Sequence, residues 1–289
     1  MRIDHNNRRV YVRQSSLNDM AICPERTRLK QVLPQFLSAT DATAMGTAVH
    51  HGIETILAGK SLKEGHEAAQ TMFASLKYEG FRETNLKPDL YEVNIDSMID
   101  AFHEGILPEV ELGGHIEYRF SVPMHMEVNG YEVWLEGTMD YMTPNGVIWD
   151  WKTASRAYNG KDKQSTSIQA SAYVLAAHTL GMCDLPAHFR YGVMIRQPDP
   201  KAQIVYLTRN DHHILWLKNI VEPYVRYALT TGLDHAWMRN DTGTLCSEQW
   251  CSHWSVCKGA CVTQDDLSLP MIPVTITPKV DTEGTTEVK

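Results

Sequence analysis

The order of the predicted helices and strands places this chain in the α/β class, with a central sheet flanked by helices. Three observations predict this. The first third of the chain has the spacing of helices, three alternating segments follow between residues 116 and 151, and a helix, two strands and a last helix come after them. Long helices on both sides of the strands argue against an all-β barrel.

The helices of the first third are predicted from capping residues and apolar periodicity. A short helix with Ser15 or Ser16 as its N-cap ends near Pro24, because the residue before a proline avoids helical angles. Residues 41–58 repeat apolar positions at helical spacing. The stretch Ser61-Leu-Lys-Glu64 is a capping box that opens the next helix. The later helices are expected over residues 62–79 and 91–106.

The strands are predicted from alternation and turn residues. Tyr118, Phe120 and Val122 alternate with polar residues, residues 131–135 alternate again, and residues 146–151 follow a Thr-Pro-Asn-Gly turn. These three segments predict an antiparallel meander. Beyond it we expect a helix over residues 165–180, strands over 189–195 and 203–207, and a helix over 215–229.

The composition limits the classes of partner and compartment. The formal net charge of -8 argues against a general polybasic coat, so contact with nucleic acid would have to come from a local groove. Residues 1–20 have no apolar signal core, and no stretch of about 18 apolar residues occurs. We expect a cytoplasmic protein, bacterial or in the host cytoplasm if phage-encoded, with no membrane contact.

The segment Gly-Val-Ile-Trp-Asp-Trp-Lys combines a strand pattern with two charged residues. Side chains two apart in a strand share a face, so Asp150 and Lys152 should project together while Trp149 and Trp151 pack into the core. The preceding strand runs antiparallel and brings Asp140 beside Asp150. Two neighbouring carboxylates repel each other unless a cation lies between them, and such hard oxygen ligands suit Mg²⁺ or Mn²⁺.

A single Asp-x-Lys is weak evidence, because charged pairs are common on solvent-facing edges. Two further motifs accompany it: Gly46-Thr-Ala-Val-His50 on an early helix, and Gln169-x-x-x-Tyr173, whose side chains share one face of a later helix. Each has an ordinary alternative, since His50 could be a polar surface residue and the other two could be packing residues. Their joint occurrence favours a functional site.

With these motifs in this order, the sequence resembles the RecB-like branch of the PD-(D/E)xK nucleases, in particular its iron-sulfur-containing exonucleases of CRISPR-associated and phage type. The resemblance extends from Ser16 to Cys261. It implies a restriction-endonuclease-like core, a central mixed sheet flanked by helices, with an N-terminal helical region and a C-terminal iron-sulfur cysteine region. It also implies a DNA exonuclease that depends on Mg²⁺ or Mn²⁺.

The resemblance also implies roles for individual residues. The divalent metal would be bound by His50, Asp140, Asp150 and the main-chain carbonyl of Trp151. Lys152 would orient the attacking water or stabilise the transition state. Gln169 and Tyr173 would position the substrate strand, and Glu117 resembles an acidic family position. Arg156, Lys161 and Lys163, in the loop after Lys152, are candidates for a local basic surface.

Four of the six cysteines lie within sixteen residues near the end of the chain. They are Cys246, Cys251, Cys257 and Cys261. Four thiolates bind either Zn²⁺ or an iron-sulfur cluster, and spacing alone does not separate a local zinc site from a cluster. Trp250 and Trp254 interleave them with apolar bulk that could shield a buried centre.

The resembling family combines one early cysteine with three late ones around a [4Fe-4S] cluster. Carried over, Cys23, Cys246, Cys251 and Cys257 would be the ligands. The family's usual late spacing is two residues and then five, whereas this chain has four and then five, so Cys261 remains an alternative ligand. Cys183 is isolated and reads as a spare thiol.

These observations predict one nuclease domain over residues 1–264. Its helical part covers about 15–110, its catalytic core about 115–230, and its cysteine region 246–261 together with Cys23, with a flexible tail over 265–289. The expected substrate is DNA that is single-stranded or has free, frayed ends, and recombination or CRISPR-adaptation proteins are candidate partners. The alternatives are a non-catalytic nucleic-acid-binding module with a structural zinc or iron-sulfur site, and a zinc-containing interaction protein.

Overall fold

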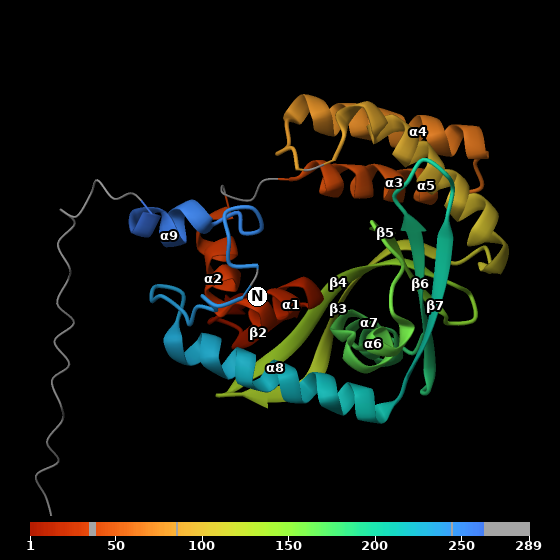
Figure 1. Ribbon diagram of the computed structural model, residues 1–289. Coiled ribbons are helices and arrows are strands. Elements are labelled where there is room, and N and C mark those ends of the chain that lie inside the picture. Colours follow the sequence, from red (N-terminus) through yellow and green to blue (C-terminus); the bar gives the residue numbers. More distant parts are fainter. Residues whose placement is uncertain (35–38, 85, 244, 263–289) are drawn as a thin grey trace, which may run out of the picture.

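The computed structural model of the chain describes residues 1–34, 39–84, 86–243 and 245–262. A seven-stranded mixed sheet with helices on both faces forms its centre (Figure 1). The predicted α/β class is therefore confirmed. The predicted tail, residues 265–289, lies outside the described residues.

The N-terminus contains the predicted first helix, together with a hairpin and a second helix that were not predicted. Strands β1 (Arg2–Asp4) and β2 (Arg9–Arg13) form a hairpin, and helices α1 (Gln14–Ile22) and α2 (Pro24–Val32) follow. The predicted serine cap of the first helix is wrong, because β2 runs directly into α1 and the N-cap is Arg13 without a side-chain cap. Ser16 instead accepts a hydrogen bond from the N-terminal ammonium at 2.9 Å.

Three helices then pack together on one side of the sheet (Figure 1). They are α3 (Asp41–Leu57), α4 (Leu62–Glu79) and α5 (Tyr91–Gly105), and short 3₁₀ turns η2 (Pro88–Leu90) and η3 (Leu107–Glu109) flank α5. The predicted capping box at Ser61 and Glu64 is present. Gly52 and Gly65 face each other between α3 and α4, and the absence of side chains there lets the two helices approach closely.

The predicted meander is confirmed, and its strands are longer than their alternating segments. Strand β3 pairs antiparallel with β4, and β4 pairs antiparallel with β5. Strand β5 then pairs in parallel with β6, and β6 antiparallel with β7, while β2 joins the other side of β4 in parallel. The strands are β3 (His115–Val128), β4 (Tyr131–Met142), β5 (Ile148–Ala154), β6 (Ala187–Ile195) and β7 (Ala202–Arg209).

The remaining helices are α6 (Gly160–Thr166), α7 (Ile168–Thr179), α8 (Asp211–Thr231) and α9 (Trp254–Val262). The helix predicted over residues 165–180 is present as α7, but its predicted start is wrong. Ser167 leaves the helical conformation between α6 and α7, and its side chain caps α7 by accepting from the backbone N–H of Ala170. None of the helices among the described residues combines the length and the apolar character needed to cross a membrane.

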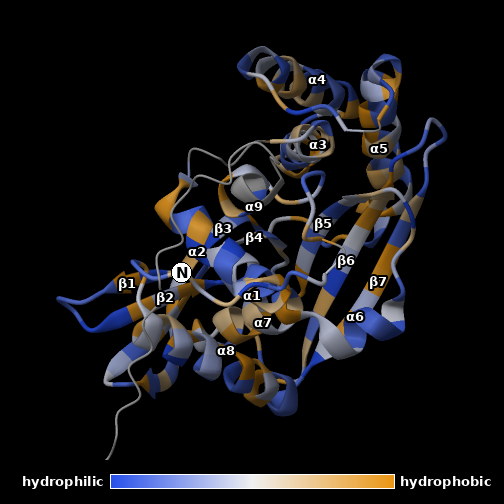
Figure 2. Cartoon of the chain, turned by 60° about the vertical axis from the view of Figure 1, so that its left-hand side comes forward, coloured by the Kyte–Doolittle hydropathy of each residue, from blue (hydrophilic) through white to orange (hydrophobic). Residues whose placement is uncertain are grey.

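Two apolar clusters cover the two faces of the sheet. One contains residues of α7 and α8 with Ile148 of β5, and the other contains residues of α3 and α5 with Trp149 and Trp151. Successive residues of β5 thus point to opposite layers, as strand geometry requires. Figure 2 shows the same alternation of hydrophilic and hydrophobic residues along β6 and β7.

Candidate functional site

The two charged residues of β5 lie together, as the alternation predicts. Asp150 is 1% exposed, and one of its oxygens, Oδ2, lies 2.5 Å from the Lys152 Nζ. Trp149 and Trp151 are buried on the other face, where their rings stack on each other. A buried carboxylate needs a partner to remain ionised, and the Lys152 ammonium is that partner.

Strand β4 brings the second carboxylate to the same place. Tyr141 pairs with Trp149 in the antiparallel register, and one step further along the strands Asp140 lies opposite Asp150. The Asp140 Oδ2 accepts a hydrogen bond of 2.7 Å from the backbone N–H of Trp151. The carboxyl group of Asp140 is thereby held against β5.

Helix α3 supplies the imidazole. The His50 Nδ1 lies 3.7 Å from the Asp140 Oδ2, and the backbone of Trp151 hydrogen-bonds the same ring. Gly46, one turn earlier, allows this approach, because a Cβ at that position would lie 3.1 Å from the Thr153 Oγ1 of β5. The spacing of Gly46 and His50 in the sequence therefore reflects the close contact of α3 with the end of β5.

The electrostatics of the cluster follow from burial. Removal from water raises the pKa of Asp140 to about 7 and that of Asp150 to about 6, and the charge of Asp140 adds to the effect on Asp150. Burial lowers the pKa of His50, which keeps its ring neutral at neutral pH. The two carboxylates raise the pKa of Lys152 despite its burial, so this ammonium stays protonated.

Helix α7 contributes the two predicted polar residues. The Gln169 Nε2 donates to the Asp150 Oδ1 at 2.6 Å and to the Tyr173 hydroxyl at 3.4 Å. Tyr173 is 5% exposed and packs edge-on against Phe120, and burial raises its pKa to about 12. The predicted pair is thus part of the site, with Gln169 in contact with the acid and Tyr173 behind it.

Two residues that sequence reasoning missed complete this contact. The Tyr191 hydroxyl of β6 donates to the Gln169 Oε1 at 3.5 Å and lies 2.6 Å from the Ser167 Oγ. Burial raises the pKa of Tyr191, so its hydroxyl stays protonated. The only local signal was the serine before α7, since the pairing of β6 with β5 comes from distant parts of the sequence.

A cavity of about 510 Å³ opens beside the cluster. Its wall includes His50, Glu54 and Glu117. Glu117 has a φ of 49°, a left-handed conformation that is uncommon for residues other than glycine. Burial and the neighbouring Glu54 raise the pKa of the Glu117 carboxyl. The predicted acidic position thus lies next to the cluster, and Glu54 joins it.

The types of donor in the cluster, though not their present arrangement, suit a hard divalent cation. Two carboxylates and a neutral imidazole are ligands that Mg²⁺ and Mn²⁺ accept. The Asp150 Oδ2 is buried, and no described residue donates a hydrogen bond of regular geometry to it. Its close neighbour is the Lys152 ammonium. Within the described ranges, however, no three His, Cys, Asp or Glu side chains are arranged so that they could hold one metal ion.

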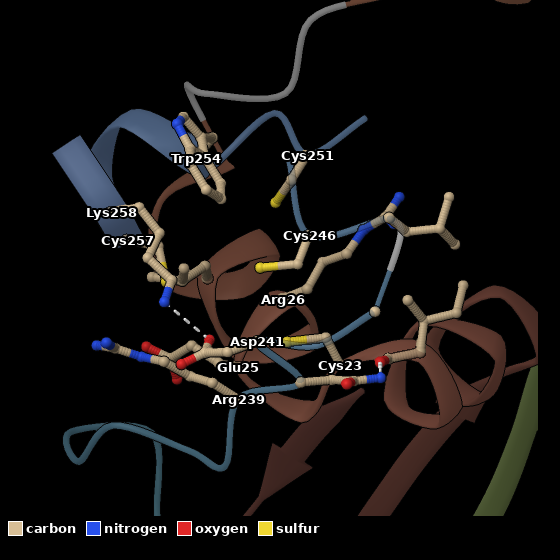
Figure 3. Close-up of a pocket in the computed structure, with 15 residues that line it drawn as sticks. Cys23, Glu25, Arg26, Arg239, Asp241, Cys246, Cys251, Trp254, Cys257 and Lys258 are labelled. Atoms are coloured by element: carbon tan, nitrogen blue, oxygen red, sulfur yellow. Dashed lines mark hydrogen bonds and ion pairs between the residues drawn. The ribbon is translucent and has the colours of Figure 1, made fainter. Parts of the chain in front are cut away.

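The predicted cysteines meet at a second place. Cys23, at the junction of α1 and α2, lines one cavity together with Cys246, Cys251 and Cys257, and Figure 3 shows these side chains around it. Burial raises the pKa of the Cys246 and Cys257 thiols, and the nearby thiols of Cys23 and Cys251 add to this effect. The side chain of Cys261 lies outside the described residues.

The two tryptophans of this region behave differently. Trp254 lies in the cavity wall, as expected for a residue that shields a buried centre. Trp250 is 56% exposed, so its predicted shielding role is wrong. It follows Gln249, whose backbone carbonyl, with that of Glu248, accepts hydrogen bonds from Arg82.

Comparison with known proteins adds to this geometry. Among solved structures, the chain is similar to a proposed exonuclease from Eubacterium rectale, with 14% identity, a TM-score of 0.53, and coverage of 85% of this chain and 92% of that one. A protein named SSO0001 aligns over 89% of this chain and 88% of its own at 10% identity, but its TM-score of 0.42 carries no argument. The first likeness shows the fold alone. No curated protein matches the chain significantly.

One family model matches most of the chain. The model described as the PD-(D/E)XK nuclease superfamily matches residues 13–258, which include α1, the whole cluster around Asp150 and three of the late cysteines. On this match, which spans most of its length, the chain belongs to the PD-(D/E)XK nuclease superfamily.

Proposed function

We propose that the protein is a Mg²⁺- or Mn²⁺-dependent deoxyribonuclease, and that it acts as an exonuclease on single-stranded DNA or on frayed DNA ends. The observation that supports this most strongly is the convergence of Asp140, Asp150, Lys152 and His50 at the end of β5. Superfamily membership supports nuclease activity, and the open cavity next to the cluster provides access for a chain end.

Each residue of the cluster has a distinct role in the proposed hydrolysis. Asp140, Asp150, His50 and the Trp151 carbonyl would hold the cation, which when bound supplies a nucleophilic water and neutralises charge on the phosphate. Lys152 stays protonated, so it acts as a fixed positive charge that orients the water and stabilises the transition state rather than as a free base.

The polar residues around the cluster position these groups. Gln169 fixes the Asp150 carboxylate through a hydrogen bond of 2.6 Å, and Tyr173, which Gln169 also contacts, lies behind it, so this pair would position the substrate strand through the carboxylate. Glu117 adds negative charge to the cavity wall and thereby favours a cation there. These are supporting roles, and loss of any of them is expected to slow cleavage rather than to abolish it.

The second part of the proposal concerns the cysteines. Cys23, Cys246, Cys251 and Cys257 would hold a [4Fe-4S] cluster, with Cys261 as the alternative ligand and Zn²⁺ as the alternative metal. Their shared cavity, with Trp254 in its wall, supports a common centre. Because Cys23 and Cys246 are more than 200 residues apart, such a centre would close a long loop and stabilise the fold.

A non-catalytic nucleic-acid-binding module is the competing function. Such a module has no need for two carboxylates whose burial disfavours their charge, held beside a protonated lysine. In this chain both carboxylates are present, with Gln169 in contact with Asp150 and His50 next to Asp140. This arrangement favours catalysis. Recombination or CRISPR-adaptation proteins are the partners that the proposed activity suggests.

Cleavage of end-labelled DNA tests the nuclease proposal. Wild-type protein should release mononucleotides or short products from a labelled single strand with Mg²⁺ or Mn²⁺, and Asp150→Ala should not. Labelled products that arise only from cuts inside the strand would contradict the proposed exonuclease activity. Cleavage by both proteins, or by neither, would overturn the catalytic assignment.

Metal analysis tests the cysteine centre. Anaerobically purified protein should contain iron and absorb near about 400 nm. Cys23→Ser should lose both signals, whereas Cys183→Ser should keep them, because Cys183 is absent from the shared cavity wall among the described residues. Zinc in place of iron would support the alternative metal. Unchanged metal content in Cys23→Ser would refute the proposed ligand set.

A further inference from the structure

A second cavity lies at the end of β5, and Glu54 and Glu117 are not part of its wall among the described residues. It has a volume of about 590 Å³ and is formed by the end of β5, the following loop and α6. Its wall begins at Ala154, two residues after Lys152, and includes Arg156, Tyr158 and Lys163. The cavity therefore adjoins the catalytic cluster directly.

The Lys163 ammonium is held close to Lys152 by a shared aromatic ring. The Lys163 Nζ lies 4.5 Å from the centroid of the Tyr158 ring and 5.9 Å from that of Tyr191, and the Lys152 Nζ lies 5.9 Å from the same Tyr191 centroid. The two nitrogens are therefore no farther apart than twice 5.9 Å. Such a distance is within the span of a few phosphates of one nucleic-acid strand.

The positive charges of this cavity are not neutralised by the protein. Neither Lys163 nor Arg156 forms an ion pair with any carboxylate in the part of the chain that the structure describes. One acid, Asp162, also reaches the wall, so the balance of the three side chains is positive. The first cavity, by contrast, carries Glu54 and Glu117. An anion is attracted to the second cavity and a cation to the first.

The loop that carries these groups is fixed to β7 by two side-chain amides. The Gln203 Oε1 accepts from the Tyr158 N–H at 2.7 Å, and its Nε2 donates to the Tyr158 carbonyl at 3.0 Å. Gln164 of α6 forms the same pair with the backbone of Thr208, at 3.1 and 3.2 Å. Each amide bonds both the N–H and the carbonyl of one residue, as a neighbouring strand would. The cavity wall is therefore fixed before any ligand binds.

A buried arginine fixes the backbone of Lys163 itself. Arg209 of β7 is 1% exposed, and its guanidinium donates to the Lys163 carbonyl at 3.0 Å. Burial lowers the pKa of this guanidinium, as expected for a charge removed from water. Fixing the backbone of Lys163 limits the directions in which its side chain can point, which favours binding by reducing the entropy lost.

From these contacts we propose that the second cavity binds the sugar-phosphate backbone of the DNA strand next to the phosphate that is cut, with Lys163 and Arg156 as its phosphate contacts. This inference rests on the proposed nuclease function. Tyr158 and Tyr191 are positioning residues that hold Lys163 beside the cluster. The strand then runs past Lys152 into the basic cavity.

Binding of a fluorescein-labelled single-stranded oligonucleotide, measured by anisotropy, tests this proposal. All variants carry Asp150→Ala, so that the DNA stays intact. Adding Lys163→Ala should weaken binding several-fold and lower the slope of log K against log salt by about 0.7, the value of one phosphate contact on a single strand. Adding Arg156→Ala should do the same. Lys163→Arg should restore the slope, because it keeps the charge.

Lys161 is the matched control, because the sequence groups it with Arg156 and Lys163 but the structure does not place it in this cavity wall. It lies on the same helix two residues from Lys163, is exposed and is absent from the cavity wall among the described residues. Lys161→Ala should leave both affinity and slope unchanged. Equal effects of Lys161→Ala and Lys163→Ala, or no effect of either, would overturn the proposed contact.

The test separates this inference from the nuclease proposal. If wild-type protein cleaves DNA and Lys163→Ala binds normally, the nuclease function stands and the second cavity is not its backbone site. If wild-type protein does not cleave but binding depends on Lys163, the cavity binds nucleic acid and the catalytic assignment fails. Absence of any binding at low salt would refute both.

Discussion

Replacing Asp140 with asparagine should stabilise the metal-free protein while removing its activity. The carboxyl group is buried, and the ionised form is unfavourable there, which raises its pKa from 3.8 to about 7. Asparagine keeps an oxygen that can accept from the backbone N–H of Trp151, which donates to Asp140 at 2.7 Å. The substitution thus removes the charge and preserves the contact.

The size of the effect follows from linkage between proton binding and folding. Raising the pKa from 3.8 to about 7 corresponds to about 4 kcal/mol of destabilisation when the group is fully ionised. Burying the polar asparagine amide costs part of this free energy, so we expect Asp140→Asn to be more stable than the wild type by about 2–4 kcal/mol at about pH 8. For a chain of this size that raises Tm by about 4–8 °C.

The dependence on pH has a definite sign. Because the folded pKa is higher than the unfolded one, the ionisation penalty in the wild type is fully present above about pH 7 and disappears as the pH falls towards 3.8. The advantage of Asp140→Asn should therefore vanish near about pH 4. Thermal unfolding in EDTA at both ends of this range measures it, with the exposed Asp199→Asn as the control.

Addition of Mg²⁺ provides an independent comparison. A cation that binds the folded state stabilises it by mass action, so Mg²⁺ should raise the Tm of the wild type more than that of Asp140→Asn. A lower Tm for Asp140→Asn than for the wild type at about pH 8 without metal would refute the reasoning, because it would mean that the charged carboxylate stabilises the fold.

Three other substitutions test separate parts of the structure. Gln169→Ala removes the hydrogen bond of 2.6 Å to Asp150 and should lower kcat by about 10–100-fold with little change in KM or Tm, as steady-state kinetics would show. Gly52→Ala places a Cβ 2.6 Å from a neighbouring side chain and should lower the free energy of unfolding by about 1–3 kcal/mol in urea, whereas Gly160→Ala, with no contact closer than 3.6 Å, should not. His66→Gln should destabilise the protein more at about pH 6 than at about pH 8.5. Despite its partial burial, the pKa of His66 is raised above 6.5 by two aspartates of α5. The stabilisation that the charged ring provides is therefore complete below pH 6.5 and is lost as the pH rises through the folded pKa.

The arrangement of β5 could be predicted because its signal is local. Alternation within seven residues places Asp150 and Lys152 on one face and the tryptophans on the other, and the structure has this arrangement. The approach of His50 could be inferred from Gly46, since the missing side chain of the glycine lets α3 lie against β5. Patterns of period two and four thus describe contacts within one element or between close neighbours.

Features that depend on distant partners could not be predicted. The hairpin of β1 and β2 is stabilised by parallel pairing of β2 with β4, more than a hundred residues away, and its two strands are only three and five residues long. Helix α6 is separated from α7 by the role of Ser167, which both caps α7 and meets Tyr191 of β6. Neither partner is visible from the local sequence.

The grouping of the cysteines shows the same limit. Spacing identified the late cysteines as a cluster of ligands, but only the fold brings Cys23 into their cavity. The junction of α1 and α2 places it there, and helix α2 itself was not predicted. The resemblance to the iron-sulfur exonucleases, and not the spacing, indicated Cys23 as a candidate ligand.

The most direct test of the account is anomalous diffraction from crystals grown with Mn²⁺. The account predicts one strong peak bounded by the side chains of His50, Asp140 and Asp150, and its disappearance in Asp150→Ala. A peak that persists in this variant, or Mn²⁺ bound elsewhere with those three side chains left without metal, would contradict the claim that they form a single cation site.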